Sequence, residues 1–346
     1  MRPVGYYLHH QGIGHWQRAT ALARRLRRPC VLLGTIPADQ RARAPCPVLD
    51  LPDDAVRDPA RHGDLAGVPG LHYAPLGHEG TRRRAAAIAG WIAARRPALL
   101  VVDVSVEVAL LSRLCATPFL YVRLNGRRED PPHLAAFRAA EALIAPFPAP
   151  LESSGTPAWV LRKSVHTGFL AVPAPPATEG GGIVVVFGRG GGGGDGAALA
   201  AAARATPDHA WRVLGPVVPA DAAPPVNLAL LGWRADAQAI LAGADLVIGG
   251  AGDGLVAEVA ALGKRFLCLP EPRPFGEQAE KAARLAGLGA AVVRPAWPAA
   301  AAWPALLREA AALDPGRIAA LHDPDALDRA AVFIDAAADR AEAYGP

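Results

Sequence analysis

Two side chains in the N-terminal half of the chain could together take a proton from a substrate. His15 lies shortly after the apolar run "VGYYL", and Asp103 ends the apolar run "LLVVD". A carboxylate that is hydrogen-bonded to one imidazole nitrogen orients the ring and raises its basicity, so that the other nitrogen can accept a proton. The pair therefore predicts a general base for a hydroxyl group. Each residue alone also fits a structural role, because His15 could start a helix and Asp103 could cap one.

The residues around His15 would allow a ligand to come close. Gly12 and Gly14 leave space beside the backbone, and a helix that starts near His15 would present free N–H groups. The stretch half-matches a dinucleotide fingerprint, but Gln17 replaces the third glycine and no acidic residue ends the next strand. The pattern argues against nicotinamide or flavin binding and places Gly12, Gly14 and Trp16 on the substrate side.

A glycine-rich stretch in the second half, "VVVFGRGGGGGDG", covers residues 184–196. It lies between an expected strand and an expected helix, where backbone N–H groups can converge on a phosphate. Arg189 could add a charge-assisted contact, so Gly188, Arg189 and Gly190 are candidate binding residues. No Gly-Lys-Ser/Thr follows, which excludes a Walker loop. The alternative is a flexible low-complexity linker.

A further glycine-rich turn, "GGAGDG", ends an apolar run and precedes the helical stretch "GLVAEVAALG". Such a turn at a helix start is another candidate anion site. On that helix, Glu258 could accept hydrogen bonds from two neighbouring sugar hydroxyls. Glu277 and Gln278 open a later helix, after the apolar run "FLCLP". The residues of the candidate turn are Gly250, Ala251, Gly252, Asp253 and Gly254.

The elements that carry these residues follow one rhythm, in which apolar runs alternate with alanine-rich segments of helical length. Continuous Val/Leu runs indicate strands buried on both faces, as in parallel sheets between helix layers. The rhythm breaks at the Pro/Gly-rich residues 171–182 and then starts again. We therefore expect an α/β fold of two Rossmann-like, doubly wound parallel-sheet domains that face each other across a cleft. The expected divisions are 1–172, 173–325 and a C-terminal helix in 326–346 that packs back toward the N-terminal domain.

The composition favours a cytoplasmic protein. Hydrophobic residues make up 51% of the 346 residues, yet no apolar run reaches the roughly 18 residues that a membrane-spanning helix needs. The N-terminus lacks the apolar core of a signal peptide, and the four cysteines form no Cys-x-x-Cys pair. Residues 1–172 carry 22 Lys and Arg against 13 Asp and Glu. This excess suits an anionic partner or peripheral contact with the inner membrane face, unless it is simply a solvated surface. We expect no nucleic-acid partner.

Taken together, the C-terminal motifs resemble the nucleotide-sugar signature of glycosyltransferases with the GT-B fold. The likeness is greatest to the MurG-like and macrolide-type enzymes of the UDP-glycosyltransferase superfamily, and it covers essentially the whole chain. The resemblance implies that Trp233 and Arg234 of "GWRAD" pack on the nucleobase, and that the turn 250–254 holds the diphosphate. It further implies that Glu258 binds the ribose hydroxyls, and that Glu277 and Gln278 bind the transferred sugar.

In the N-terminal half, "GIGHWQR" resembles the Gly-His loop of the same family. The resemblance makes His15 the general base, oriented by Asp103. Two departures concern the diphosphate turn, where Gly250 replaces a frequent His or Arg, and Gly254 and Leu255 replace a frequent Ser or Thr. Phosphate would then be held by backbone N–H groups, with help from Arg189.

The expected function is that of an inverting transferase that moves a sugar from a nucleoside-diphosphate sugar to a hydroxyl acceptor. A ribose-binding Glu258 favours UDP over dTDP, and the acceptor is a natural product or a lipid-linked or anionic molecule. We expect no cofactor and no metal, because the sequence has no His/Cys cluster at ligand spacing. Two alternatives stay open, namely a non-hydrolysing UDP-sugar epimerase and a binding protein that has lost catalysis.

Overall fold

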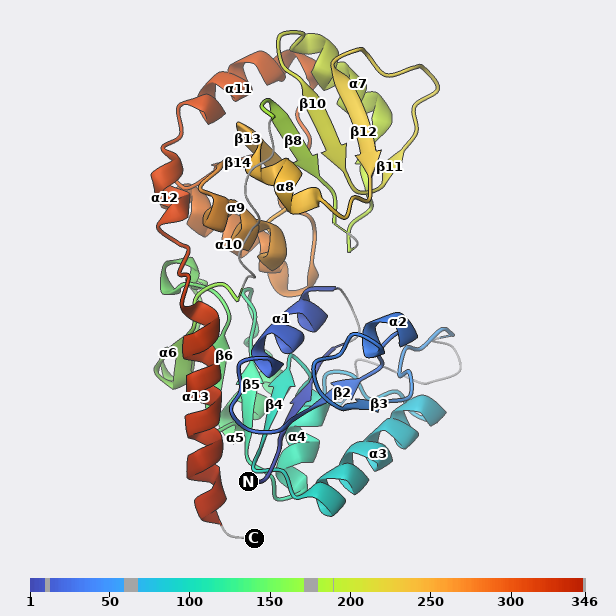
Figure 1. Ribbon diagram of the computed structural model, residues 1–346, viewed down its shortest axis with the longest axis vertical. Coiled ribbons are helices and arrows are strands. Elements are labelled where there is room, and N and C mark those ends of the chain that lie inside the picture. Colours follow the sequence, from blue (N-terminus) through green and yellow to red (C-terminus); the bar gives the residue numbers. More distant parts are fainter. Residues whose placement is uncertain (10–12, 59–67, 171–179, 189, 345–346) are drawn as a thin grey trace.

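The computed structural model describes residues 1–9, 13–58, 68–170, 180–188 and 190–344, and these fold around two large parallel β-sheets (Figure 1). The expectation of two doubly wound α/β domains is thereby confirmed. The predicted division between residues 172 and 173 lies outside the described residues, as do Gly12 and Arg189. In the described part of the chain, no helix is both long and apolar enough to cross a membrane.

The N-terminal sheet has seven strands in the order β3-β2-β1-β4-β5-β6-β7, and every pairing is parallel. All five residues of β4 are buried, because helices cover both faces of the sheet. The strand order reverses between β1 and β4, which is where ligands bind in open α/β sheets. The strands are β1 (Val4–Tyr7), β2 (Cys30–Gly34), β3 (Val48–Asp50), β4 (Leu99–Asp103), β5 (Phe119–Val122), β6 (Ala142–Ala145) and β7 (Ser164–His166).

Local sequence signals start several helices of this sheet. The Ser105 hydroxyl accepts a hydrogen bond from the Val108 N–H at the start of α4, and the Asp130 carboxylate accepts one from the His133 N–H at the start of α5. The helices are α1 (Ile13–Ala23), α2 (Ala38–Arg41), α3 (Glu79–Arg95), α4 (Val106–Leu114), α5 (Pro131–Ala139), η2 (Ala149–Leu151) and α6 (Ala158–Lys163).

The C-terminal sheet has six strands in the order β12-β10-β8-β13-β14-β15, again all parallel, and the two-stranded pair β11-β9 lies apart from it. Most of its apolar strand residues are buried between helices on both sides, whereas Ala229 and Leu230 of the edge strand β12 are exposed. The strands are β8 (Ile183–Val186), β9 (Gly194–Asp195), β10 (Trp211–Leu214), β11 (Val217–Val218), β12 (Leu228–Gly232), β13 (Leu246–Gly249), β14 (Arg265–Cys268) and β15 (Val292–Val293).

The helices of the second half cover this sheet, except for the last long one, α13, which descends along the first sheet (Figure 1). The helices are α7 (Gly196–Ala205), α8 (Ala237–Ala242), α9 (Asp253–Leu262), η3 (Pro274–Gly276), α10 (Glu277–Gly287), η4 (Ala300–Ala302), α11 (Trp303–Ala311), α12 (Pro315–Ala319), α13 (Ala326–Ala341) and η5 (Glu342–Tyr344).

Helix α13 is part of the core of the first half. Its residues Leu327, Ala330 and Ile334 are buried in one hydrophobic cluster with Val4 and Tyr6 of β1. We call the N-terminal sheet, its helices and α13 the N-terminal lobe, and the C-terminal sheet with its own helices the C-terminal lobe. The polypeptide therefore returns to the N-terminal lobe after completing the C-terminal one.

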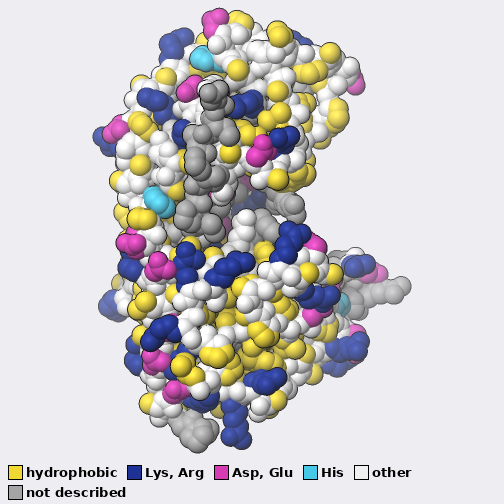
Figure 2. All heavy atoms as spheres, in the orientation of Figure 1, with side chains coloured by type: hydrophobic (Ala, Val, Ile, Leu, Met, Phe, Trp, Pro, Cys, Tyr) yellow, Lys and Arg dark blue, Asp and Glu magenta, His cyan; other side chains and the backbone are white. Residues whose placement is uncertain are grey.

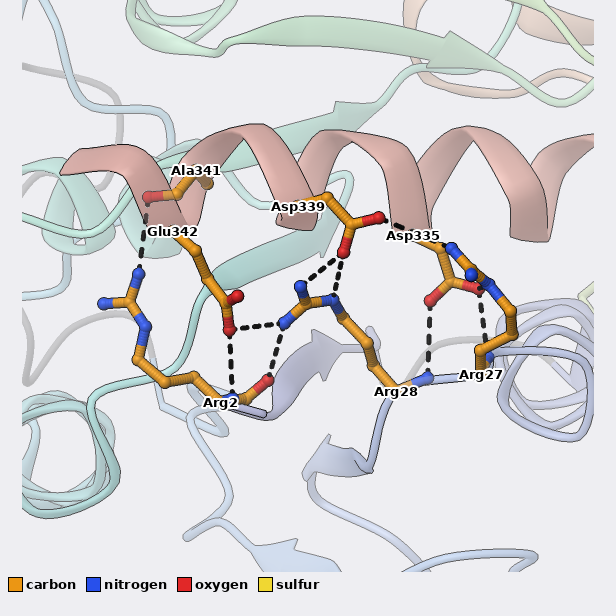
Figure 3. Close-up of polar contacts among 7 residues, drawn as sticks. All are labelled: Arg2, Arg27, Arg28, Asp335, Asp339, Ala341 and Glu342. Carbon is orange, nitrogen blue, oxygen red and sulfur yellow. Dashed lines mark hydrogen bonds and ion pairs between the residues drawn. The ribbon is translucent and has the colours of Figure 1, made fainter. Parts of the chain in front are cut away.

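Ion pairs fasten α13 to the turn before β2 (Figure 3). The buried Arg28 guanidinium donates to Glu342 Oε1 at 2.7 Å and to Asp339 Oδ1 at 3.0 Å. The backbone N–H of Arg27 donates to Asp335 Oδ2 at 3.0 Å. Hydrogen bonding from Arg28 holds the pKa of Glu342 at about 2. Arg28 is thus the residue through which several carboxylates of the C-terminal segment bind the first sheet.

We predict that Arg28→Ala lowers the free energy of unfolding of the N-terminal lobe by roughly 2 kcal/mol, since a buried charged donor with several partners is lost. Urea unfolding followed by near-UV circular dichroism measures this effect. The control is Arg25→Ala, which removes the more exposed pair with Asp328 and should cost less than about 1 kcal/mol. Equal losses in the two variants would contradict a special role for Arg28.

Candidate active site

The structure brings His15 and Asp103 together. Asp103 ends β4, and His15 lies in the first turn of α1, which follows the neighbouring strand β1. The imidazole Nδ1 lies 3.1 Å from Asp103 Oδ1, and the carboxylate is completely buried whereas 14% of the His15 side chain is exposed. Asp103 does not cap the following helix, because Ser105 does so. The carboxylate therefore faces the imidazole.

A third residue, Arg18, joins this pair and was not singled out in the sequence. Its Nη2 lies 2.9 Å from both carboxylate oxygens of Asp103 and 3.1 Å from His15 Nδ1, and its Nε donates to Oδ2 at 3.2 Å. Burial alone would raise the pKa of Asp103, but the charge of Arg18 and the contact with His15 outweigh it and lower that pKa to about 2. Asp103 is therefore ionised throughout the neutral range.

The position of Arg18 has a sequence signal that could have been used. His15 and Arg18 are three residues apart on one helix, so their side chains lie on the same face. In the structure Arg18 is almost completely buried, and a buried arginine requires an anionic partner. The sequence does not say which carboxylate that partner is, because Asp103 is 85 residues away along the chain.

A cleft separates the N-terminal halves of α1 and α9, and Figure 2 shows the surface hollowed between the two lobes. The cleft has about 610 Å³ of empty space, including its open side. Gly14 and Arg18 lie on one wall and Asp253 and Glu258 on the other, so residues from both predicted sites meet there. The lining residues are Gly14, Gln17, Arg18, Pro146, Phe169, Leu170, Gln238, Asp253, Gly254, Ala257 and Glu258.

Trp16, predicted on the substrate side, does not line this cleft. It packs, partly buried, against the hydrophobic cluster under α1. The reason is the helical period, because Trp16 points to a different side of α1 from Gly14 and Arg18, which line the cleft. Gly14 is exposed, and among the described residues no atom outside its chain neighbours lies within 4 Å of where a Cβ would lie.

The predicted diphosphate turn lies at the start of α9, whose N-cap residue Gly252 makes no side-chain cap. The free N–H groups of such a helix start attract anions. Asp253, the first helical residue, forms an ion pair with Lys281, whose side chain is completely buried. Burial would raise the pKa of Asp253, but Lys281, with smaller contributions from Arg18 and His15, lowers it. Lys281 is a second functional candidate that the sequence analysis missed.

Gln278, predicted to bind the transferred sugar, links two loops of the C-terminal lobe. Its side-chain oxygen accepts hydrogen bonds from the backbone N–H groups of Ala251 and Glu271, both at 2.9 Å, and the residue is buried. A Cβ on Gly250 would lie 2.9 Å from that oxygen. The close approach explains why glycine, and no larger residue, occupies position 250.

Glu258 lies on α9 and faces the cleft. Its Oε1 accepts a hydrogen bond from Gln238 Nε2 at 3.3 Å. Burial raises the pKa of Glu258, and the contact with Gln238 opposes this rise. The side chain is thus a hydrogen-bond acceptor fixed at the edge of the cleft, as binding of neighbouring hydroxyls requires.

Three further predicted donor residues, Trp233, Arg234 and Glu277, are also not among the residues that line the cleft. Trp233 is 57% exposed on the loop after β12, and Arg234 beside it pairs with Asp236 at 2.8 Å. Glu277 pairs at 3.4 Å with Arg128 of the N-terminal lobe.

Of the three candidate binding residues in the glycine-rich loop after β8, the structure describes Gly188 and Gly190. Gly188 is exposed, with nothing within 4 Å of where a Cβ would lie. A Cβ on Gly190 would lie 3.2 Å from Arg273 Nη2. The loop therefore passes close to the segment between β14 and α10, which contains Glu271.

We predict that Gly250→Ala lowers the free energy of unfolding by about 1–3 kcal/mol, because the new methyl group displaces Gln278 and leaves two buried N–H groups without an acceptor. The control is Gly254→Ala, where nothing lies within 4 Å of the added Cβ and stability should be unchanged or raised by up to about 1 kcal/mol. Thermal and urea unfolding measure both variants. A stable Gly250→Ala variant would refute the explanation of this glycine.

Comparison with known proteins agrees with this arrangement. Residues 223–296 match the glycosyltransferase family 28 C-terminal domain, a segment that includes the turn 250–254, Glu258 and Gln278. No curated protein sequence matches the chain.

Solved structures with a similar fold span nearly the whole chain. MurG from Acinetobacter baumannii is 18% identical over 97% of this chain and 100% of its own, with a TM-score of 0.68. The glycosyltransferase VinC, solved in complex with dTDP, is 14% identical over 98% and 100%, with a TM-score of 0.67. The glycotransferase of kitacinnamycin is 15% identical over 100% and 99%, with a TM-score of 0.66. At these identities the structures show the fold alone, which is the GT-B fold of these glycosyltransferases. The match to family 28 concerns residues 223–296 of the C-terminal lobe.

Proposed function

We propose that the chain is an inverting, metal-independent glycosyltransferase that moves a sugar from a nucleoside-diphosphate sugar to a hydroxyl acceptor, with His15 as the general base. The observation that carries the proposal is the cleft. One wall is α1, which carries His15 beside the buried Asp103 of β4, and the other is the start of α9 with Glu258. A base on one side and an anion-binding helix start on the other are what a direct displacement at an anomeric carbon needs.

In the proposed reaction, the acceptor hydroxyl lies beside His15 Nε2. This nitrogen takes the proton as the acceptor oxygen bonds to the anomeric carbon, and the bond between that carbon and the diphosphate oxygen breaks on the opposite face. The charge that develops on the leaving diphosphate is stabilised by the N–H groups at the start of α9. The ammonium of Lys281 offsets the Asp253 carboxylate at the same place. The proton held by His15 makes the imidazole cationic, and Asp103 stabilises that form.

The donor in this proposal is a UDP-sugar, with dTDP-sugars as the competing class. Glu258 supports UDP, because a carboxylate in the cleft can accept hydrogen bonds from both ribose hydroxyls. The dTDP complex of VinC, which has a similar fold, supports the other class. The acceptor is a natural product or a lipid-linked or anionic molecule, and the basic excess of residues 1–172 suits the anionic one.

We predict that His15→Ala lowers turnover by about 10²–10⁴-fold, the usual contribution of a general base, and changes the affinity for UDP by less than about twofold. Turnover is measured by mass spectrometry with a panel of UDP- and dTDP-sugars and mixed acceptors, and UDP affinity by calorimetry. The matched control is His209→Ala, since His209 is exposed and lies outside the cleft.

The same assay, run in EDTA, tests the other parts of the proposal. Undiminished transfer by His15→Ala would remove this residue from the mechanism, and loss of transfer in EDTA would contradict metal independence. An isomerised donor in the absence of any acceptor would instead identify an epimerase.

We predict that Glu258→Gln weakens UDP binding about tenfold and dTDP binding less, because dTDP lacks the ribose 2′-hydroxyl. A tenfold loss corresponds to roughly 1.4 kcal/mol, which lies near the value of a hydrogen bond to a charged group. The control is Glu309→Gln, since Glu309 forms an exposed pair with Arg294. Calorimetry with both nucleotides measures the difference, and equal losses for UDP and dTDP would refute the ribose contact.

A further inference from the structure

Arg18 is a buried cation in direct contact with the proposed base. Its guanidinium contacts both oxygens of Asp103 at 2.9 Å and lies 3.1 Å from His15 Nδ1. The side chain is only 8% exposed, and Asp103 is not exposed at all. The residue also contributes to the wall of the cleft. The cation therefore contacts both members of the His15–Asp103 pair.

The consequence of these contacts for the imidazole follows from elementary electrostatics. A buried carboxylate beside an imidazole favours the charged imidazolium, because opposite charges attract strongly where water is excluded. An imidazole that is already protonated cannot accept a proton from a substrate. Asp103 alone would therefore tend to disable the base that it orients. The charge of Arg18 offsets much of that of Asp103, so the attraction of the carboxylate for a charged ring is weakened.

The geometry adds a second effect. Contacts from Nε and Nη2 span both carboxylate oxygens, and such a fork fixes the plane of the carboxylate. Tyr6 contributes a longer contact, its hydroxyl donating to Asp103 Oδ2 at 3.5 Å. Held in this way, Oδ1 faces His15 Nδ1 at 3.1 Å. A ring that donates its Nδ1 proton to Oδ1 keeps the Nε2 lone pair free.

We propose that Arg18 is a positioning residue that keeps His15 neutral and protonated at Nδ1, so that Nε2 can accept the substrate proton. The inference rests on the proposed role of His15 as general base. A competing arrangement has the same contacts, because Arg18 could instead donate to an unprotonated Nδ1. The proton would then be on Nε2, and the ring could not act as a base.

Other titratable groups near His15 come from both lobes. The ring of His9, after β1, has its centroid 5.9 Å from that of His15. Asp253 of α9 interacts electrostatically with His15 and Arg18, and is itself paired with Lys281 of α10. Substitution of Arg18 leaves all of these groups in place, so a change in the titration of His15 would report the loss of Arg18.

The first test needs neither donor nor acceptor. NMR of the full chain labelled with ¹⁵N-histidine gives the tautomer and the titration of His15, with the signals assigned from His15→Ala. We expect the Nδ1–H tautomer in the unsubstituted protein. In Arg18→Gln, the pH midpoint of the His15 signals should rise by about one unit, since removal of a neighbouring cation favours the charged ring. An Nε2–H tautomer, or the same midpoint in folded Arg18→Gln, would overturn the proposal.

Two further variants separate charge from folding. Arg18→Lys keeps the charge but not the fork, so its midpoint should stay near that of the unsubstituted protein. The matched control is Arg84→Gln, because Arg84 is also buried and pairs with Asp54 and the Tyr7 hydroxyl in the same lobe. This variant should leave the His15 midpoint unchanged even if it destabilises the lobe. An equal shift in Arg84→Gln would show that the effect is structural, and would overturn the proposal.

Kinetics link the inference to the reaction. Turnover of Arg18→Gln should fall at least tenfold at neutral pH and recover partly as the pH rises, while the KM for the donor stays within about threefold. Turnover unchanged in Arg18→Gln but lost in His15→Ala would refute only the role of Arg18. Turnover unchanged in both would refute the proposed function itself.

Discussion

A carboxylate with no exposed surface stays charged inside a protein only if cations and hydrogen-bond donors surround it. Asp103 meets this condition through Arg18 and His15, and the arrangement fixes the surrounding architecture. Strands β1 and β4 must therefore have their carboxyl ends on the same side of the sheet. Helix α1 must start there, with the imidazole of His15 and the guanidinium of Arg18 on one helix face. The reversal of strand order between β1 and β4 provides that place.

The opposite wall of the cleft also contains a buried charge with a partner of opposite sign, but here the buried charge is a cation. There the cation, Lys281, is completely buried and the carboxylate, Asp253, lies closer to solvent. A carboxylate at a helix start occupies the position that a phosphate would also favour. The lysine beneath it removes the repulsion that an unpaired carboxylate would exert on an anionic ligand. Both walls thus combine a helix start with an internally neutral ion pair, and Glu258 adds a carboxylate that accepts a hydrogen bond from the neutral amide of Gln238.

Most of the fold could be predicted because parallel sheets leave a strong pattern, and buried strands such as β4 are continuous apolar runs. His15 and Asp103 could be found for a related reason, since each lies at or just after the end of such a run. Arg18, Lys281 and the oxygen of Gln278 could not be assigned from the sequence. Their roles depend on which distant residue they meet, and in each case that partner lies 27 to 85 residues away. The need for glycine at position 250 could not be predicted either, because it depends on the close approach of Gln278. Trp16 is predicted on the substrate side because it follows His15 in the sequence, but the two side chains face different sides of α1.

Helix α13 is synthesised after the C-terminal lobe but packs in the N-terminal lobe. It supplies Leu327, Ala330 and Ile334 to the core around β1, and Asp339 and Glu342 to Arg28. Domains generally fold as units while the chain emerges from the ribosome, N-terminal ones first. Here the first lobe to be synthesised lacks one wall of its core until the whole C-terminal lobe has been made. The N-terminal lobe is therefore synthesised first but completed last, and until then its sheet exposes the part of the apolar face that α13 covers.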